Sequence, residues 1–177
     1  MDAWMDQTLL LAAKDGDSKA FEALVVVHRS MLWSVCLRIT GNTYDAEDAL
    51  QNTLLAAWRG IANFRGESGF STWLYRIAAN AALAVIRSRK TTEELADTLV
   101  SPERDFAEQL AASDQIQAML KSLPEDFRVA LVLRELCDFT YAQVASYQGV
   151  GVATVKSRIS RARRILETAL LAEADRG

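Results

Sequence analysis

Five basic residues and no acidic residue lie between positions 156 and 164 of the 177-residue sequence: Lys156, Arg158, Arg161, Arg163 and Arg164. An arginine guanidinium can donate two hydrogen bonds to the edge of a guanine, which is worth about 1–3 kcal/mol of discrimination between bases. Neighbouring cations neutralise phosphates and so position a protein on the duplex without recognising its sequence. The chemistry that this cluster predicts is therefore duplex DNA binding.

The spacing of the apolar residues in the same segment predicts an amphipathic helix from about Val152 to Ala172. A buried stripe is expected at spacings of three and four residues: Val152, Val155, Ile159, Ala162, Leu166 and Ala169. The opposite face carries Ser157, Ser160, Arg161 and Arg164, with Lys156, Arg158 and Arg163 on its flanks. The structural alternative is a helix whose charges are merely solvated, and five bases without an acid argue against it.

A short helix and a glycine turn are expected directly before that segment. Thr140 and Gln143 have the spacing of a capping box for a helix ending at Gln148, and Gly149 permits a tight turn. A short helix, a turn and a longer second helix resemble a helix-turn-helix, whose second helix enters the major groove. This motif indicates DNA binding and leaves the role of the protein open.

The segment 64–90 interleaves aromatic and basic side chains: Phe64, Arg65, Phe70, Trp73, Tyr75, Arg76, Arg87, Arg89 and Lys90. Such a pattern suits single-stranded DNA, because unstacked bases pack on aromatic rings while cations neutralise the phosphates. Phe70 and Trp73 can equally be core residues, and for Trp73 we favour the core. The loop Arg65–Gly69 is the better candidate for an unstacked base, since its glycines permit close approach of the backbone.

The rest of the chain predicts an all-α protein of two small helical domains joined by a flexible acidic linker. Helices are expected after Asp6 and from an N-cap near Ser18 to Ile39. A third is expected from Thr43 to Trp58, with a buried stripe of Ala46, Leu50, Leu54 and Trp58. Three more are expected from Ser71 to Arg89, from Ala107 to Leu123, and from Pro124, as the first helical residue, to Leu136. The predicted domains are residues 1–90 and 107–177. The linker 91–106 contains Pro102 and lacks helical periodicity.

The net charge of −3 is unevenly distributed. Residues 1–58 carry −4, residues 59–90 +5, residues 91–148 −7 and residues 149–177 +3. Two basic segments are thus separated by acidic sequence, and the local field matters more to a polyanion than the total charge. No apolar run is long enough to span a bilayer, and the N-terminus has no basic segment of the signal-peptide type. We therefore expect a cytoplasmic protein without membrane insertion.

The inventory of reactive residues argues against an enzyme. Cys36 and Cys137 lie far apart in sequence, and His28 is the only histidine. This suits neither a disulfide framework nor a metal site nor an activated nucleophile. We expect both cysteines to be buried as small hydrophobic residues, His28 to lie on a helix surface, and no cofactor or metal to be bound.

The sequence resembles the extracytoplasmic-function (ECF) class of sigma factors along nearly its whole length. Residues 20–24 (AFEAL) resemble the start of region 2, residues 45–53 (DAEDALQNT) its D-A-E-D segment, and residues 70–80 (FSTWLYRIAAN) its F-x-x-W-L-x-R-I-A-x-N segment. Residues 123–128 (LPEDFR) and 154–163 (TVKSRISRAR) resemble region 4. Five such segments in the family's order are more specific than any one alone.

The resemblance implies particular partners for particular residues. The clamp helices of the largest RNA polymerase subunit would bind Asp45, Asp48, Gln51, Asn52 and Leu55. The promoter −10 element would be recognised and opened by Arg65, Gly66, Glu67, Ser68, Arg76 and Asn80. The −35 element would be recognised by Lys156, Ser157, Arg158, Ser160, Arg161 and Arg164. The flap of the second-largest subunit and an anti-sigma protein are further implied partners, and the acidic linker would thread toward the polymerase's active-site channel.

Three residues depart from the family's pattern. Asn52 stands where an acid is usual, which predicts a weaker polymerase contact. Gly151 stands where Ser or Pro often caps the recognition helix, which predicts fraying of its first turn. Gln148 replaces a usual apolar residue before the turn, which predicts a looser corner there.

Two other functions remain as alternatives. An independent helix-turn-helix regulator that binds DNA as a dimer would explain residues 124–172 but would leave the features of residues 45–52 and 64–90 unused. Gel-shift of duplex promoter DNA by the isolated chain, without polymerase, would distinguish it. An enzyme would need a phosphate loop, a metal-ligand cluster or a nucleophile with its base, and the sequence offers none of these.

Overall fold

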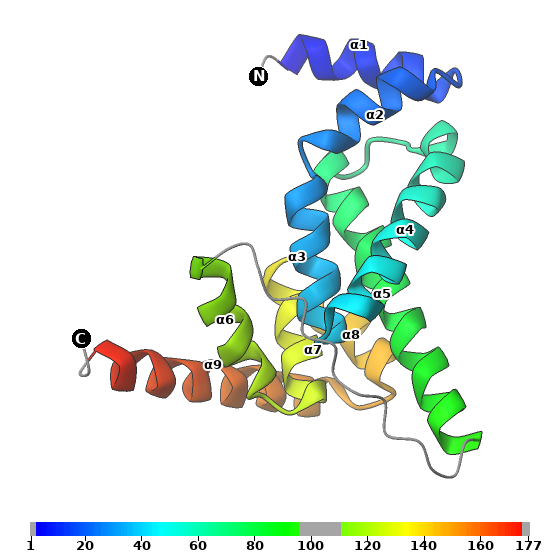
Figure 1. Cartoon of the computed structure of the whole chain (residues 1–177). Helices are drawn as coiled ribbons and strands as arrows, with labels where there is room; N and C mark the ends of the chain where they lie inside the picture. Colours follow the sequence, from blue (N-terminus) through cyan, green and yellow to red (C-terminus); the bar gives the residue numbers. More distant parts are fainter. Residues whose placement is uncertain (1–2, 96–110, 175–177) are drawn as a thin grey trace.

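The computed structural model describes residues 3–95 and 111–174, and in these ranges it consists of helices without strands (Figure 1). The elements in order are α1 (Ala3–Lys14), α2 (Ser18–Val26), α3 (Arg29–Thr40), α4 (Thr43–Gly60), the 3₁₀ turn η1 (Ile61–Asn63), α5 (Phe70–Leu95), α6 (Ala111–Lys121), α7 (Glu125–Glu135), α8 (Tyr141–Gln148) and α9 (Val152–Ala174). We call α1–α5 the N-terminal body and α6–α9 the C-terminal body. The expected all-α class is confirmed.

The N-terminal body is built around α3, α4 and α5, which pack on one another. Its interior consists largely of small and branched side chains, including Leu32, Val35, Ala46 and Leu74, all fully buried. On α4 the buried stripe is Ala46, Ala49, Leu50, Thr53 and Ala57. The buried stripe expected through Leu54 and Trp58 was therefore wrong at its C-terminal end. Trp58 is 36% exposed, and its ring packs edge-on against that of Phe21.

Two details near the start of this body differ from expectation. The helix predicted to run unbroken from Ser18 to Ile39 is interrupted at Val27 and His28, so that α2 and α3 are separate and bent by 66°. The N-cap of α2 is Asp17, whose carboxylate accepts hydrogen bonds from the backbone N–H groups of Lys19 and Ala20. Ser18 is already helical, because the aspartate before it satisfies the free amides.

Helix α5 is longer than the sequence indicated. It begins at Phe70 and continues to Leu95, beyond the predicted end at Arg89 and into the first residues of the predicted linker. The remainder of that linker, and the first residues of the helix expected from Ala107, lie outside the described residues.

The C-terminal body ends in the expected helix-turn-helix. The capping box of Thr140 and Gln143 is present on α8, and Gly149 ends α8 in the left-handed conformation at φ +63°. Pro124 occupies the N-cap of α7, one position before the predicted first helical residue. On α9, Val155, Ile159 and Ala162 are buried, whereas Val152 is exposed because the turn lifts the first residue off the core.

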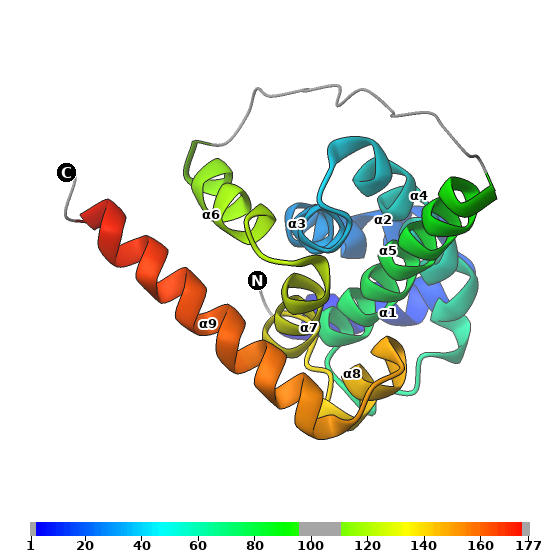
Figure 2. The ribbon, with the colours of Figure 1, turned by 90° about the horizontal axis from the view of Figure 1, so that it is seen from below.

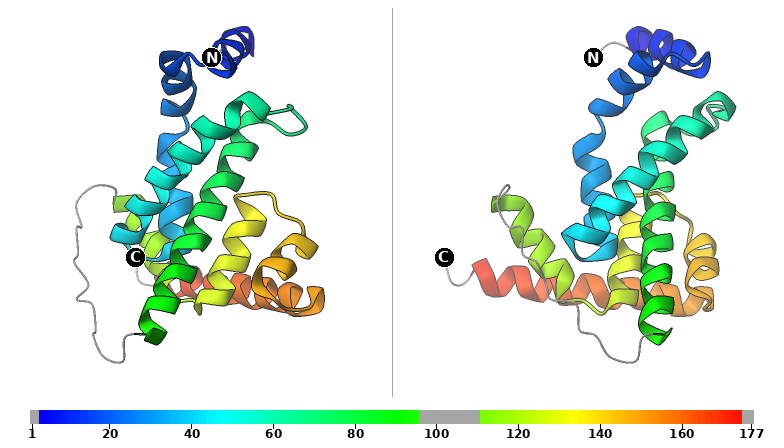
Figure 3. Two further views of the ribbon diagram at one scale, coloured as in Figure 1. Left: turned by 90° about the vertical axis from the view of Figure 1, so that its right-hand side faces the viewer. Right: turned by 45° about the vertical axis from the view of Figure 1, so that its right-hand side comes forward.

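The two bodies pack together, and their buried side chains form one continuous cluster. Helix α7 lies against α3, and Figure 2 shows α7 below α3 and next to the near end of α5, with α8 beside α5. Figure 3 shows the same arrangement from the side, with α9 crossing below the N-terminal body. Arg128 of α7 is 7% exposed and donates to the carbonyl of Ile39 at the C-terminal end of α3. A buried cation at that end complements the helix dipole.

No single helix of the described ranges is long and apolar enough to cross a bilayer; only the bent pair α2–α3 passes such a test by length and composition.

Candidate nucleic-acid interface

The outward face of α9 presents the predicted residues to solvent. Lys156, Ser157, Ser160, Arg161 and Arg164 are all exposed. No hydrogen bond or ion pair with a described residue holds the side chains of Arg161 and Arg164, so both guanidinium groups are available to a ligand. Lys156 lies over the ring of Tyr141 at 5.5 Å, which places its charge beside the first residue of α8.

Arg158 lies apart from this exposed face. Its guanidinium donates to Gln148 at 2.7 Å and forms an ion pair with Asp126 at 2.9 Å, and its side chain is only 18% exposed. Gln148 also donates to the carbonyl of Asp126. The glutamine thus joins α7, α8 and α9 at one corner. The expectation that it loosens this corner was wrong, because its amide supplies two polar contacts that an apolar residue would lack.

Aromatic rings pack together where the loop between η1 and α5 begins and ends. Phe64 and Phe70, which flank it, have ring centroids 5.7 Å apart, and Trp73 lies 5.1 Å from Phe64 and 5.6 Å from Phe70. Trp73 is half-buried in this cluster, in agreement with its assignment to the core. The tip is exposed: the side chains of Arg65 and Glu67 are 84% and 81% accessible, and Gly66 has φ +74°.

The other two residues predicted for the −10 element, Arg76 and Asn80 on α5, contact the C-terminal body. Arg76 donates to the carbonyl of Asp138 at 3.0 Å and lies over the ring of Phe139. The hydroxyl of Tyr147 donates to the side-chain oxygen of Asn80. The structure therefore brings these residues to α8 and to the connection between α7 and α8.

Further along α5 the basic residues pair with the same body. Arg87 lies over the ring of Tyr147 at 5.3 Å from its centroid, and burial raises the pKa of that tyrosine. Glu125 accepts from Lys90 at 2.6 Å and from Arg89 at 3.3 Å. The basic residues of α5 thus have acidic, carbonyl and aromatic partners in the C-terminal body, while Arg87 and Lys90 remain exposed. Sequence analysis missed this contact, because it joins residues at least 35 positions apart without a local pattern.

The residues predicted to bind polymerase divide into two groups. Asp48, Gln51, Asn52 and Leu55 are exposed on one side of α4. Asp45 is not part of that surface: its side chain is 13% exposed and is paired with Arg89 at 2.7 Å. Its carboxylate also accepts from Asn42, the N-cap of α4. Asp45 therefore joins the start of α4 to α5.

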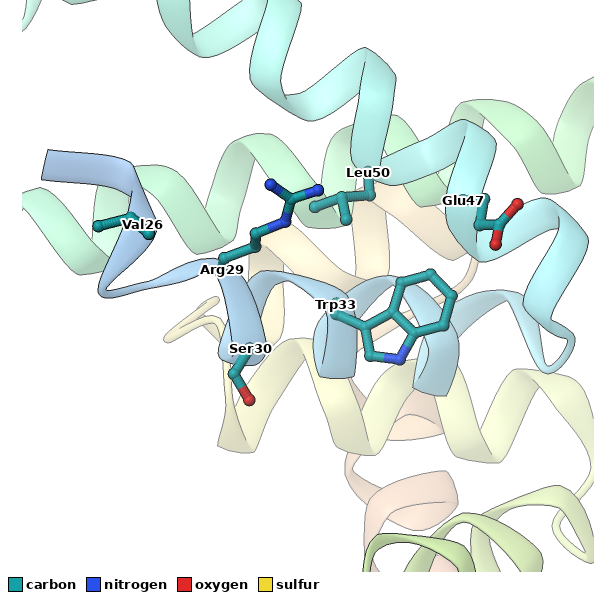
Figure 4. Close-up of a pocket in the computed structure, with 6 residues that line it drawn as sticks. All are labelled: Val26, Arg29, Ser30, Trp33, Glu47 and Leu50. Atoms are coloured by element: carbon teal, nitrogen blue, oxygen red, sulfur yellow. The ribbon is translucent and has the colours of Figure 1, made fainter. Parts of the chain in front are cut away.

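An open pocket of about 550 Å³, which no sequence pattern indicated, lies beside this surface (Figure 4). It is lined by Val26, Arg29, Ser30, Trp33, Glu47 and Leu50, from α2, α3 and α4. Figure 4 shows the Arg29 guanidinium beside Leu50, with the Trp33 indole lying across from Glu47.

The two cysteines and the histidine have structural surroundings. Cys36 and Cys137 are both fully buried, as expected. Burial raises the pKa of Cys36 to about 11 and that of Cys137 to about 12, which keeps both thiols protonated. His28 is half-buried between α2 and α3, where it packs against Phe70 and Tyr75 and not on an open helix surface. No group of metal-ligating side chains is found in the described parts of the chain.

Comparison with known proteins agrees with this arrangement. Residues 24–92 match the family model of sigma-70 region 2, and residues 113–166 match that of sigma-70 region 4. The RNA polymerase sigma-H factor of Pseudomonas aeruginosa is 36% identical over 180 residues, covering 93% of each chain. The ECF RNA polymerase sigma-E factor of Escherichia coli (strain K12) is 34% identical over 177 residues, covering 92% of each.

Two solved structures have the same fold. The sigma factor RpoE of Bartonella quintana, in complex with the anti-sigma factor NepR, aligns with a TM-score of 0.62 and 27% identity over 86% of this chain and 97% of its own. CnrH, in complex with the cytosolic domain of CnrY, aligns with a TM-score of 0.57 and 26% identity over 95% of this chain and 98% of its own.

The chain therefore belongs to the ECF sigma factors of the sigma-70 family. It is a transcription initiation factor and not an enzyme: it acts with RNA polymerase and directs initiation to specific promoters.

Proposed function

We propose that the chain recognises a promoter with two separate surfaces, one on each body. The −35 element binds the outward face of α9, through Ser157, Ser160, Arg161 and Arg164, with Lys156 contacting phosphate. The −10 element is opened by the loop Arg65–Gly69 together with Arg76 and Asn80. The polymerase clamp helices bind the exposed side of α4, through Asp48, Gln51, Asn52 and Leu55.

The observation that carries the proposal is the contrast between exposed and paired cations on α9. Arg161 and Arg164 point outward and are held by no described residue, whereas Arg158 is committed to Gln148 and Asp126. A helix that exposes unpaired arginines at its outer face has the donors that guanine edges and phosphates require. Arg158 accordingly has a supporting role at the base of the recognition helix.

The proposal includes an opening step. Arg76 and Asn80 are engaged by Asp138, Phe139 and Tyr147, so their polar groups must exchange these partners before they bind DNA. The C-terminal body must therefore leave α5 before the −10 element is engaged. The same separation lets the two surfaces reach elements that lie apart on the promoter. Binding of the polymerase core to α4, and of its flap to the C-terminal body, would supply the free energy for this separation.

An anti-sigma protein is the proposed negative regulator, and the cytoplasm is the proposed location. One structural neighbour is a sigma factor in complex with an anti-sigma factor, NepR, and the other, CnrH, is in complex with the cytosolic domain of CnrY. A partner that favours the packed arrangement of the two bodies would keep Arg76 and Asn80 covered.

Transcription in vitro with purified core polymerase, followed by mapping of start sites, tests the proposal. The chain should direct the core to discrete start sites, and the sequences upstream of those sites should share two elements. A chain that neither joins the core nor selects any start site would contradict it.

Charge reversal at Asp48 tests the polymerase surface separately. Asp48→Lys should weaken core binding by about tenfold or more, because a like charge replaces an attractive one at an interface. Duplex binding by α9 should be unchanged. Glu22→Lys is the matched control, since Glu22 is an exposed acid on α2, away from that surface. Equal core affinity of the Asp48→Lys variant and the wild-type chain would remove Asp48 from the interface.

A further inference from the structure

The loop that carries Arg65, Gly66, Glu67 and Ser68 is held at both ends by the same aromatic cluster. Phe64 precedes the loop, Phe70 follows it, and Trp73 contacts both rings. Gly60, the last residue of α4, permits this packing, because a Cβ there would lie 3.3 Å from the Trp73 ring. The positions of the loop ends therefore depend on what holds Phe64, Phe70 and Trp73.

Helix α1 supports this cluster from the N-terminal side. Ala13 is 1% exposed and forms a small core with Ala20, Leu24 and Ile61, against which Phe70 and Trp73 also pack. Figure 1 shows α1 lying across one end of α2, at the same end of the molecule as the loop between α4 and α5. Helix α1 also contacts η1, the turn that leads into the loop.

Lys14, the last residue of α1, connects the helix to the loop directly. Its ammonium donates to the backbone carbonyl of Phe64 at 2.8 Å, across 50 positions of sequence. The backbone N–H of Phe64 is in turn bound to the carbonyl of Ile61. Both polar backbone groups of the residue that begins the loop are therefore fixed. A cation at the end of α1 is also favoured by the dipole of that helix.

We propose that Lys14 is a positioning residue for promoter opening: it fixes Phe64, and through Phe64 the conformation of the loop Arg65–Gly69 that captures an unstacked promoter base. A loop that is already ordered loses less conformational entropy when it binds, so fixing its first residue raises affinity for the opened strand. Lys14 and α1 lie outside residues 24–92, which match the region 2 model. The inference rests on the proposed role of this loop at the −10 element.

The test compares three variants in the holoenzyme formed with core polymerase. Lys14→Met removes the donor and retains the length of the side chain, Lys14→Arg retains a donor, and Lys19→Met removes one exposed positive charge from the neighbouring helix α2. The probes are a single-stranded oligonucleotide carrying the −10 element of a promoter mapped with the wild-type chain, and the same oligonucleotide with that element scrambled. Promoter opening is followed by permanganate reactivity of unpaired thymines.

Lys14→Met should bind the −10 oligonucleotide about two- to tenfold more weakly, which is less than the full value of a charged hydrogen bond because Lys14 acts on the strand only through Phe64. It should open the duplex promoter correspondingly less, while its affinity for the scrambled strand and for core polymerase stays at the wild-type value. Lys14→Arg should restore most of the loss, and Lys19→Met should behave as wild type.

Three results would overturn the inference: wild-type opening by Lys14→Met, an equal loss in Lys19→Met, or a fall in core affinity and melting temperature that accompanies the loss of opening. The last would show that Lys14 merely stabilises the fold. Failure of the proposed function would look different, because the wild-type holoenzyme itself would then show no preference for any −10 strand.

Discussion

The two surfaces proposed to bind promoter DNA differ in their accessibility. On α9, Arg161 and Arg164 project into solvent with no described partner. On α5, Arg76 and Asn80 bind the C-terminal body, and Arg89 and Lys90 pair with Glu125. The cations on the outer face of α9 are thus without described partners, whereas those of α5 have partners in the C-terminal body.

The difference explains the uneven charge of the sequence. Residues 59–90 carry +5 and residues 91–148 carry −7. Glu125 from the acidic segment meets Arg89 and Lys90 from the basic one. Glu125 therefore neutralises part of the charge that Arg89 and Lys90 would otherwise offer to phosphates. If the proposed −10 surface is correct, DNA competes with Glu125 for these two cations.

The reactivity of Cys137 should show the largest effect if the covered surface opens. This thiol is fully buried, and burial, with Cys36 as a second cause, raises its pKa from 9.0 to about 12, while Arg76 of α5 acts to lower it. The reactive thiolate is therefore much scarcer at pH 8 than for a free cysteine. Binding of core polymerase should accelerate alkylation of Cys137 by about tenfold or more, as measured by mass spectrometry of its peptide.

Cys36 in the same sample is the internal control. It lies within the N-terminal body beside Thr53, and its pKa is raised to about 11. Its alkylation should remain slow when the bodies separate. Equal acceleration of both cysteines would indicate unfolding, and no acceleration of Cys137 would mean that its surroundings stay closed in the holoenzyme.

Replacement of Arg128 should loosen the packing of the two bodies. Its guanidinium is buried and donates to the carbonyl of Ile39, and a Cβ on Gly41 would lie 3.0 Å from it. Arg128→Met should cost about 1.5–3 kcal/mol of interdomain stability, the usual value of a hydrogen bond to a charged group. Small-angle scattering should show a larger radius of gyration. Arg134→Met, on the same helix but bonded to Phe139 of its own body, should leave it unchanged.

Removal of Arg161 should affect recognition of one base pair only. Arg161→Ala should cost about 1–3 kcal/mol at a single position of the −35 element and little elsewhere. Arg158→Ala should instead weaken binding to all duplexes, because it releases the corner formed with Gln148 and Asp126. Duplex binding assays against a set of single-base variants distinguish the two. A uniform loss for Arg161→Ala would place that side chain on phosphate.

Removal of the Tyr147 hydroxyl should give the smallest effect. Tyr147→Phe eliminates the hydrogen bond to Asn80 and should favour separation by about 0.5–1.5 kcal/mol. The free chain should then bind a −10 single strand up to about tenfold more tightly in a fluorescence titration. Tyr44→Phe is the control, since Tyr44 is 81% exposed on α4. Unchanged affinity in Tyr147→Phe would mean that this contact does not limit access to Asn80.

The features that the sequence predicted well are local in origin. The capping box on α8, the Gly149 turn and the exposed arginines of α9 each follow from residues within a few positions of one another. The break between α2 and α3 was missed, because no glycine or proline marks Val27 and His28. The last turns of α5 were missed because Thr91 and Thr92 are weak helix formers, which here bond back to the carbonyls of Arg87 and Ser88.

The parts of the candidate site that were not predictable depend on tertiary contacts. Asp45 has the sequence context of a surface residue, and it is buried only because Arg89 reaches it from another helix. The position of Arg158 on its helix is that of a residue that contacts phosphate. Its guanidinium is engaged only because Asp126 of α7 and Gln148 of α8 bind it. The Lys14–Phe64 bond spans 50 positions, and neither residue type indicates the other.

The most direct test of these conclusions is the distance between the two bodies in the free chain and in the holoenzyme. Spin labels at the exposed positions Tyr44 on α4 and Leu170 on α9, introduced after both cysteines are replaced by alanine, allow it to be measured by pulsed electron paramagnetic resonance. One narrow distance distribution is expected for the free chain, and a clearly longer one once core polymerase and promoter DNA are bound. The same distribution in both states would contradict the opening step.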